Sequence, residues 1–155
     1  MRKIDMLLTE YGESHQNHTN KAVHWVCVPV IVWTVMVLLH SLPVPTWFAA
    51  LPWLDWLIVS LGLAMIYYVL LSPSLAVGIA VYAATGIYLI RLLESATTRP
   101  IWQIGLGLFV LAWIGQFWGH KIEGKKPSFF KDIQFLLIGP AWLLSFLYRR
   151  AGIPI

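Results

Sequence analysis

The chain has 155 residues, of which 59% are hydrophobic and 12% are charged, and its formal net charge is +4. A soluble domain usually has about 25% charged residues, and a fold of this length could not bury so much apolar surface. The composition therefore excludes an ordinary soluble protein and predicts a single integral-membrane domain over residues 1–155 that contacts the lipid bilayer.

The first predicted element is a short amphipathic helix over residues 5–18. Asn20 is a good N-cap for the segment that follows. Four apolar segments come next, each of roughly 18–20 residues, which is enough to cross the hydrocarbon layer at about 1.5 Å per residue. These transmembrane helices are expected at about residues 22–39, 53–71, 75–92 and 101–118.

The last apolar run, residues 133–148, is shorter, and Gly139-Pro140 interrupts it. A marginal span and a kinked, re-entrant or interfacial helix are both compatible with this pattern. The sequence therefore predicts an all-α, polytopic membrane helical bundle. It has four transmembrane helices, an N-terminal amphipathic helix and a kinked or marginal fifth apolar helix.

Positive charge orients the predicted bundle. The N-terminal segment and residues 119–132 fall on the same face, which carries more Lys and Arg than the other and should be cytoplasmic. No Lys/Arg stripe interleaved with aromatic residues appears elsewhere, so we expect no nucleic-acid partner. Asp55 is expected at the far interface in a solvated, structural role, since an unpaired carboxylate at the bilayer centre costs about 2.5–3.5 kcal/mol.

Three histidines fall at the predicted cytoplasmic edge: His15, His24 and His120. Imidazole is the commonest protein ligand for transition metals. Nine residues separate His15 from His24, so one continuous helix would point them in opposite directions. A shared ion therefore requires a helix break, for which Thr19-Asn20 is the natural place. A shared metal site and separate, hydrogen-bonded boundary histidines both remain open on spacing alone.

Several polar residues are placed to support these histidines. Tyr11 precedes His15 by four residues and Gln116 precedes His120 by four, so each pair shares a helix face. Glu123 is a candidate catalytic residue, either as a fourth ligand or as an orienter of an imidazole. The residues expected to hold the ligands or contact substrate are Tyr11, Asn20 and Gln116.

The remaining candidates have simpler interpretations. His18 either joins the face of His15 or is a solvated loop residue, and His40 is expected as a hydrogen-bonded residue at the opposite face. Cys27 lies in an apolar run and is expected to pack in the core. Gly119 and Gly124 permit a close backbone approach or a turn.

Two motifs carry a family resemblance. The first is Tyr-x3-His-x4-Asn-x3-His at Tyr11, His15, Asn20 and His24, followed by Pro29. The second is Gln-x2-Gly-His-x2-Glu-Gly-x2-Pro at Gln116, Gly119, His120, Glu123, Gly124 and Pro127, with Gly139-Pro140 further on. With both motifs, the chain resembles the small membrane proteins catalogued as domain of unknown function 962. The characterised fungal member of that family is an endoplasmic-reticulum 2-hydroxy fatty acid dioxygenase of phytosphingosine breakdown.

The resemblance implies an Fe(II)-dependent α-oxidation, in which a 2-hydroxy fatty acid and O2 give a fatty acid one carbon shorter. No 2-oxoglutarate is needed, and the family's histidines carry over to His15, His24 and His120 as iron ligands. The short basic chain looks bacterial, which places it in the inner membrane with the histidine site on the cytoplasmic side. Bacteria generally lack phytosphingosine, so another 2-hydroxy acyl chain is a candidate substrate. The oligomeric state is not predicted.

Two functions of other classes also fit the residues. Histidines on neighbouring helices can ligate a b-type haem for electron transfer. A non-catalytic lipid-binding membrane protein needs no metal at all, and a zinc hydrolase is a close variant of the iron enzyme. Metal analysis and a product assay separate these hypotheses.

Overall fold

The structure is a computed structural model that describes residues 2–126 and 134–155. Within these ranges the chain is helical and has no strand, which confirms the predicted all-α bundle. In chain order the elements are α1 (Lys3–Glu13), α2 (His18–His40), the 3-10 helix η1 (Thr46–Ala50), α3 (Trp56–Leu71), α4 (Pro73–Ala96), α5 (Ile101–Glu123) and α6 (Phe135–Ala151).

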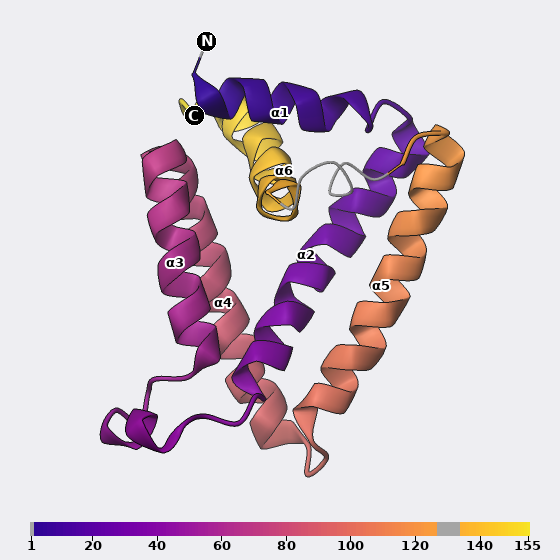
Figure 1. Cartoon of the computed structure of the whole chain (residues 1–155). Helices are drawn as coiled ribbons and strands as arrows, with labels where there is room; N and C mark the ends of the chain where they lie inside the picture. Colours follow the sequence, from indigo (N-terminus) through magenta and orange to yellow (C-terminus); the bar gives the residue numbers. More distant parts are fainter. Residues whose placement is uncertain (1, 127–133) are drawn as a thin grey trace.

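Four helices alternate in direction between two edges of the molecule (Figure 1). We call the edge with both termini and α1 the upper edge, and the edge with η1 the lower edge. The helices α2, α4 and α5 have 23, 24 and 23 residues and are long and apolar enough to cross a membrane, whereas the apolar α3 has 16. The N-terminus and the end of α5 lie at the same edge, as four crossings require.

Two predicted helix starts are wrong, and each is displaced by a capping side chain. The segment expected from residue 22 begins at His18, because the Asn17 side chain accepts hydrogen bonds from the backbone N–H groups of Thr19 at 2.8 Å and Asn20 at 3.3 Å. Asn20 is therefore not the cap. Likewise, the helix expected from residue 53 begins at Trp56, because the Asp55 side chain caps it and accepts a hydrogen bond from the Ile58 N–H at 2.8 Å.

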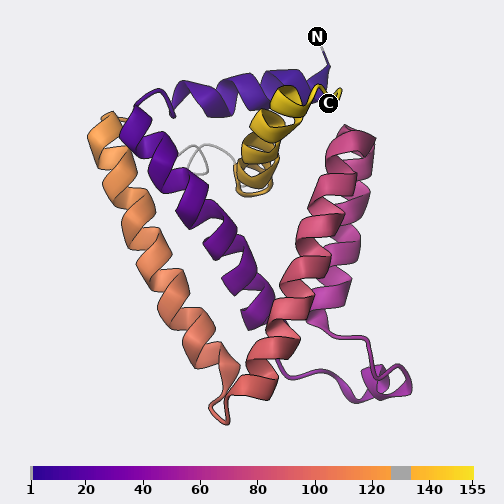
Figure 2. The ribbon, with the colours of Figure 1, turned by 180° about the vertical axis from the view of Figure 1, so that it is seen from behind.

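The helix α6 begins within the bundle, ends at the upper edge and does not reach the lower edge (Figures 1 and 2). It has 17 residues and contains Pro140. Tyr68 of α3 donates from its hydroxyl to the Leu137 carbonyl at 2.6 Å, and Tyr148 donates to the Ser74 carbonyl at 2.8 Å. These contacts favour the re-entrant interpretation over a crossing helix. The predicted start at residue 133 lies outside the described residues.

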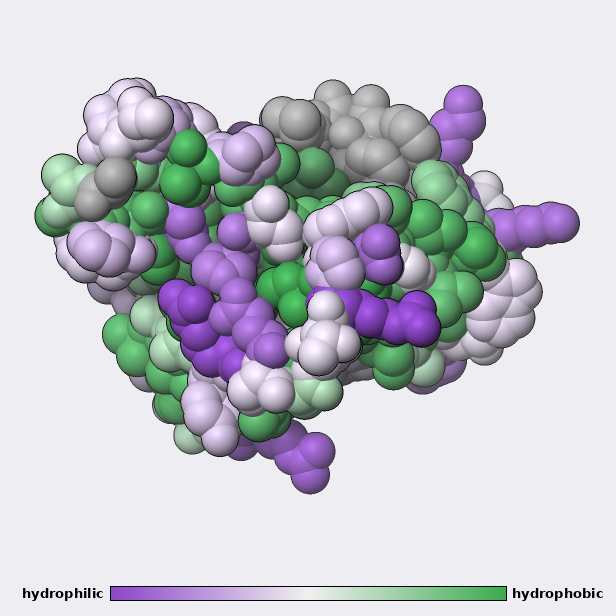
Figure 3. All heavy atoms as spheres, turned by 90° about the horizontal axis from the view of Figure 1, so that it is seen from below, coloured by the Kyte–Doolittle hydropathy of each residue, from purple (hydrophilic) through white to green (hydrophobic). Residues whose placement is uncertain are grey.

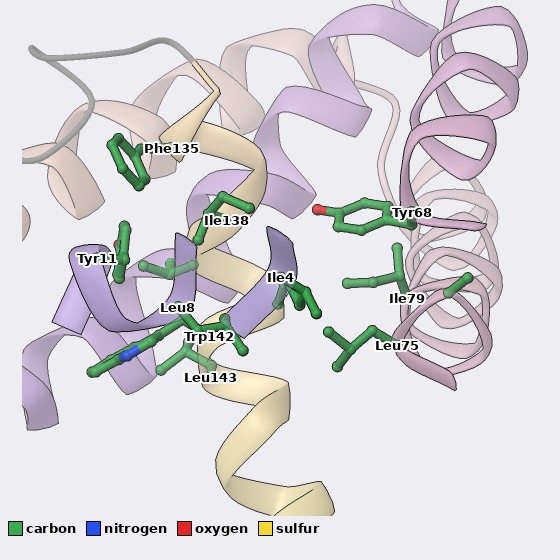
Figure 4. Packing of buried hydrophobic residues seen from close by; sticks show 13 residues of the cluster. Ile4, Leu8, Tyr11, Tyr68, Leu75, Ile79, Phe135, Ile138, Trp142 and Leu143 are labelled. Carbon is green, nitrogen blue, oxygen red and sulfur yellow. The ribbon is translucent and has the colours of Figure 1, made fainter. Parts of the chain in front are cut away.

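An apolar cluster holds α1 across the upper edge. Ile4 and Leu8 of α1 pack with Ile138 and Trp142 of α6 and with Leu75 of α4 (Figure 4). All five side chains are at most 5% exposed. This packing fixes α1 against α6, and so it fixes the turn that follows α1.

The helices α2 and α5 run side by side (Figures 1 and 2). Glycines of α5 face α2 closely: a Cβ at Gly105 would lie 2.8 Å from Val37, at Gly115 2.7 Å from Cys27, and at Gly119 2.5 Å from the Asn20 side chain. Any larger residue there would push the helices apart. The expected close approach at Gly119 is confirmed, and Gly124, with φ +73°, ends α5 in the left-handed conformation.

A polar contact joins three helices at the lower edge. The ring of His40, at the end of α2, lies between Asp55 at 2.5 Å and Glu94 of α4 at 3.0 Å. His40 thus has the hydrogen-bonded role expected of it. Asp55 has a structural role as expected, but its side chain is only 16% exposed and is bound to His40, so it is not the solvated residue that the sequence predicts. Figure 3, which views the molecule from this edge, shows hydrophilic side chains in groups among apolar ones.

Candidate metal centre

His15, His24 and His120 meet at the upper edge. His15 lies in the turn after α1, His24 in the second turn of α2 and His120 in the last turn of α5. Their exposed fractions are 0%, 1% and 5%, and one ring nitrogen from each lies within 4.8 Å of the other two. Two of these buried imidazoles come from the start of the chain and the third lies almost a hundred positions later. Together they could hold one metal ion.

The hydrogen bonds of two rings fix their tautomers. His15 donates from Nδ1 to the Tyr11 carbonyl at 2.6 Å, and His24 donates from Nδ1 to the Asn20 carbonyl at 2.9 Å. Because a carbonyl only accepts, each neutral ring carries its proton on Nδ1 and a lone pair on Nε2. The two Nε2 atoms lie 2.9 Å apart, so their lone pairs face each other.

Facing lone pairs repel each other unless a cation lies beside both. Burial lowers the pKa of His15 to about 4, so a proton does not supply that charge at neutral pH. Two imidazoles bound at right angles with bonds of about 2.1 Å would have nitrogens about 3.0 Å apart, close to the observed separation. In addition, the buried Nδ1 of His120 has no hydrogen-bond partner among the described residues. The donor set thus fits a transition metal.

Glu123 binds the turn that carries His15. Its carboxylate accepts from the backbone N–H groups of Gln16 and Asn17, each at 2.9 Å, and from the Asn20 side chain at 3.0 Å. The structure therefore places Glu123 outside the group of three ring nitrogens, with its oxygens occupied by the turn. Through these bonds the end of α5, which carries His120, is joined to the segment between His15 and His24.

Asn20 connects the same parts from within. Its side-chain amide also donates to the Ser14 carbonyl at 3.3 Å, while its own carbonyl accepts from His24. Asn20 is fully buried. The structure therefore places it next to the histidines and in contact with Glu123, as expected for a residue that supports a ligand.

Tyr11 covers one side of the centre. Its ring stacks on His15 with centroids 4.2 Å apart and planes 10° from parallel. Burial raises the pKa of the Tyr11 phenol above its usual range, so the hydroxyl stays neutral. The ring of Trp142 in α6 lies against both of these rings, with its centroid 5.2 Å from that of His15 and 5.4 Å from that of Tyr11. Together these rings exclude water from one face of His15.

A small cavity of about 50 Å³ opens beside the histidines. Tyr11, His24, Gln116 and His120 line it, together with apolar residues of α2, α5 and α6. We call it the site cavity. Gln116 is buried one turn before His120. A polar head group that enters this cavity therefore meets two imidazoles, the Gln116 side chain and the Tyr11 ring.

Comparison with known proteins assigns the family. The family model described as 2-hydroxy-palmitic acid dioxygenase Mpo1-like matches residues 1–151. The chain belongs to the Mpo1-like family. The predicted resemblance is thereby confirmed, and the family name indicates dioxygenase-type activity on a 2-hydroxy fatty acid. No curated protein and no solved structure matches the chain.

The remaining histidine and the cysteine of this Mpo1-like chain lie apart from the centre. His18 is exposed and is not in the group of three, so it is solvated as the second alternative has it, but it lies at the first position of α2 and not in a loop. Cys27 is half-buried against α5, as expected for packing. Pro127 of the second motif lies outside the described residues.

Sequence reasoning missed Asn17 and Trp142. Asn17 could have been found as a rival cap, because either asparagine fits the N-cap preference. Trp142 gives no such signal, since a tryptophan in an apolar run is equally typical of a lipid-facing belt. Its role depends on α6 folding back beneath α1.

Removing the Glu123 carboxylate should weaken metal binding without abolishing it. Glu123→Ala leaves two backbone N–H groups without their acceptor and loosens the turn beside His15. Loss of a residue that holds ligands typically lowers metal affinity about 10–100-fold. Metal titration of purified protein measures the change, and Glu10→Ala, an exposed glutamate of α1, is the control. Equal affinity in Glu123→Ala and the parent would show that the carboxylate does not position the histidines.

Proposed function

We propose that this chain binds Fe(II) through His15, His24 and His120 and shortens 2-hydroxy fatty acids by one carbon with O2. The observation that carries the proposal is the pair of Nε2 lone pairs facing each other at 2.9 Å inside a buried group of three imidazoles. The family description supplies the dioxygenase class and the 2-hydroxy acyl substrate.

We infer the identity of the metal from the reaction class alone, because three imidazoles with open coordination positions suit Zn²⁺ as well as non-haem Fe(II). When bound, Fe(II) supplies the O2 chemistry that no side chain of this centre provides. A haem fits less well, because the cavity beside the histidines, of about 50 Å³, is too small for a porphyrin ring.

The overall reaction balances without a further co-substrate. A 2-hydroxy acid and O2 give the shortened acid, CO2 and water, and the substrate supplies all four electrons that O2 accepts. Hence the chain needs a place for one acyl chain and its head group, and no site for 2-oxoglutarate.

The side chains around the centre bind and orient the head group. Gln116 can donate from its amide to the substrate carboxylate or accept from its 2-hydroxyl, which places C2 beside the histidines. Such positioning is a large part of catalysis in general. Tyr11 and Trp142 keep water from His15, and the carbonyls of Tyr11 and Asn20 hold two rings with their lone pairs directed inward.

The orientation of the bundle is part of the proposal. The centre lies at the upper edge, which carries the Lys/Arg-rich N-terminal segment, so we propose that it faces the cytoplasm from a bacterial inner membrane. A carboxylate head group at this interface could stay near water while its chain enters the bundle.

Metal analysis of anaerobically purified protein combined with a product assay tests the proposal. We expect stoichiometric iron and, from 2-hydroxypalmitate and O2, a product one carbon shorter. Palmitate, which lacks the 2-hydroxyl, is the matched control and should not be shortened. Zinc in place of iron, an intense haem absorption, or no shortened product would each contradict the proposal.

A further inference from the structure

A second apolar cavity, of about 130 Å³, lies beyond the site cavity, between α2, α4 and α6. The two cavities share Val28 and Val32 of α2 as a common wall. These valines follow His24 by one and two turns, so the two cavities adjoin along this stretch of α2. The histidine centre therefore lies at the polar end of two adjoining cavities.

The second cavity leads into a groove between α2 and α4. Pro29 and Tyr82 line both of them, and the groove continues past Trp33 to Leu89 and Leu92. Leu89 and Leu92 are 42% and 51% exposed, so the groove is open to the surroundings of the bundle at this end. In a membrane those surroundings are lipid chains.

The lining of this path suits a hydrocarbon chain. None of the residues that line the second cavity or the groove is charged. Three polar side chains of the path are already hydrogen-bonded: Tyr82 donates to the Pro29 carbonyl at 2.5 Å, Trp33 to the Gly86 carbonyl at 3.1 Å, and Thr85 to the Val81 carbonyl at 2.9 Å. A ligand here therefore finds mainly apolar contacts.

We propose that this path holds the acyl chain of the substrate, an inference that rests on the proposed function. The head group lies at His24, His120 and Gln116, the chain passes Val28 and Val32, and its tail leaves between α2 and α4 into the lipid. Because lipid tails are as apolar as the path, burial of the chain adds little affinity. The walls instead position C2, and the open end sets no upper limit on chain length.

A bulky residue in the second cavity, away from the site cavity, tests the path. Leu144 of α6 lines the second cavity and not the site cavity. Leu144→Trp should close the passage and lower kcat/KM for 2-hydroxypalmitate about 100-fold, as misplacement of a substrate can do. The iron content, and turnover of 2-hydroxybutanoate, whose chain is too short to fill the second cavity, should stay at parental values. Leu137→Trp is the matched control on the same helix, since Leu137 is 37% exposed and lines none of these cavities. Equal losses for both substrates, or no loss, would overturn the path.

Photolabelling tests the same path without turnover. Palmitic acid with a diazirine in the middle of its chain, in phosphatidylcholine liposomes, should label Tyr82 and Leu144, which line the second cavity, and excess 2-hydroxypalmitate should remove this label. Leu144→Trp should remove the label at Tyr82, whereas Leu137→Trp should not. If Leu144→Trp cannot be recovered from membranes, Leu144→Phe, which fills the second cavity less completely, takes its place with the same expectations.

The outcomes separate the two proposals. Labelling of Tyr82 and Leu144 that competes with 2-hydroxypalmitate, in a protein that makes no shortened product, would support the path and contradict the proposed function. Shortened product together with uncompeted or dispersed labelling would support the function and overturn the path.

Discussion

His24→Ala is expected to abolish iron retention and activity while the protein still inserts into the membrane. His24 lies at the middle of the centre: its Nε2 faces that of His15, and its ring lies 4.9 Å from that of His120. Alanine removes one of three ligands and the hydrogen bond that the His24 imidazole donates to the Asn20 carbonyl. The affinity for iron should fall more than about 100-fold, beyond the usual effect of losing a residue that only supports a ligand.

His18→Ala is the matched control for this experiment. His18 lies on the same helix, six residues earlier, but it is exposed and outside the group of three. Iron per purified chain and the yield of shortened product from 2-hydroxypalmitate should stay at parental values in this variant. Full iron content in His24→Ala would sink the ligand assignment, and iron loss in His18→Ala would show that the upper edge binds metal in some other way.

The helix break between His15 and His24 shows what spacing alone can predict. Half a turn of phase difference makes a continuous helix incompatible with a shared ion, so the need for a break follows from geometry. The position of the break does not follow from geometry, because Asn17 and Asn20 are equally good N-caps. The choice depends on Glu123, more than a hundred residues later, which binds the Asn20 side chain and the Asn17 N–H.

The spacing within α5 does not determine the role of Glu123, for a related reason. A carboxylate that lies three residues from His120 on the same helix can either coordinate the metal or form a hydrogen bond that orients a neighbouring residue. The backbone N–H groups that bind it exist only once the turn before α2 has formed, and no pattern within α5 reports them. The course of α6 was undetermined as well, since 17 residues with an internal proline suit several depths in a membrane.

At the contact between α5 and α2, replacing Gly119 by alanine is expected to lower the stability of the protein. Gly119→Ala places a Cβ 2.5 Å from the Asn20 side chain and 3.3 Å from Val23. Asn20 cannot turn aside without giving up its bonds to Ser14 and Glu123. The helix α5 must therefore move away from α2, and His120, the next residue, moves with it.

Gly107→Ala on the same helix is the matched control, because a Cβ there meets nothing within 4 Å. Alanine favours a helix over glycine by about 1 kcal/mol, so Gly107→Ala should leave thermal stability unchanged or raised and iron content unaltered. Overpacking typically destabilises by about 1–3 kcal/mol, so Gly119→Ala should lower stability despite the same gain in helix propensity. Its iron affinity should fall at least about tenfold. Equal iron affinity and equal melting temperature in the two variants would mean that the close approach of α5 to α2 does not hold the three imidazoles together.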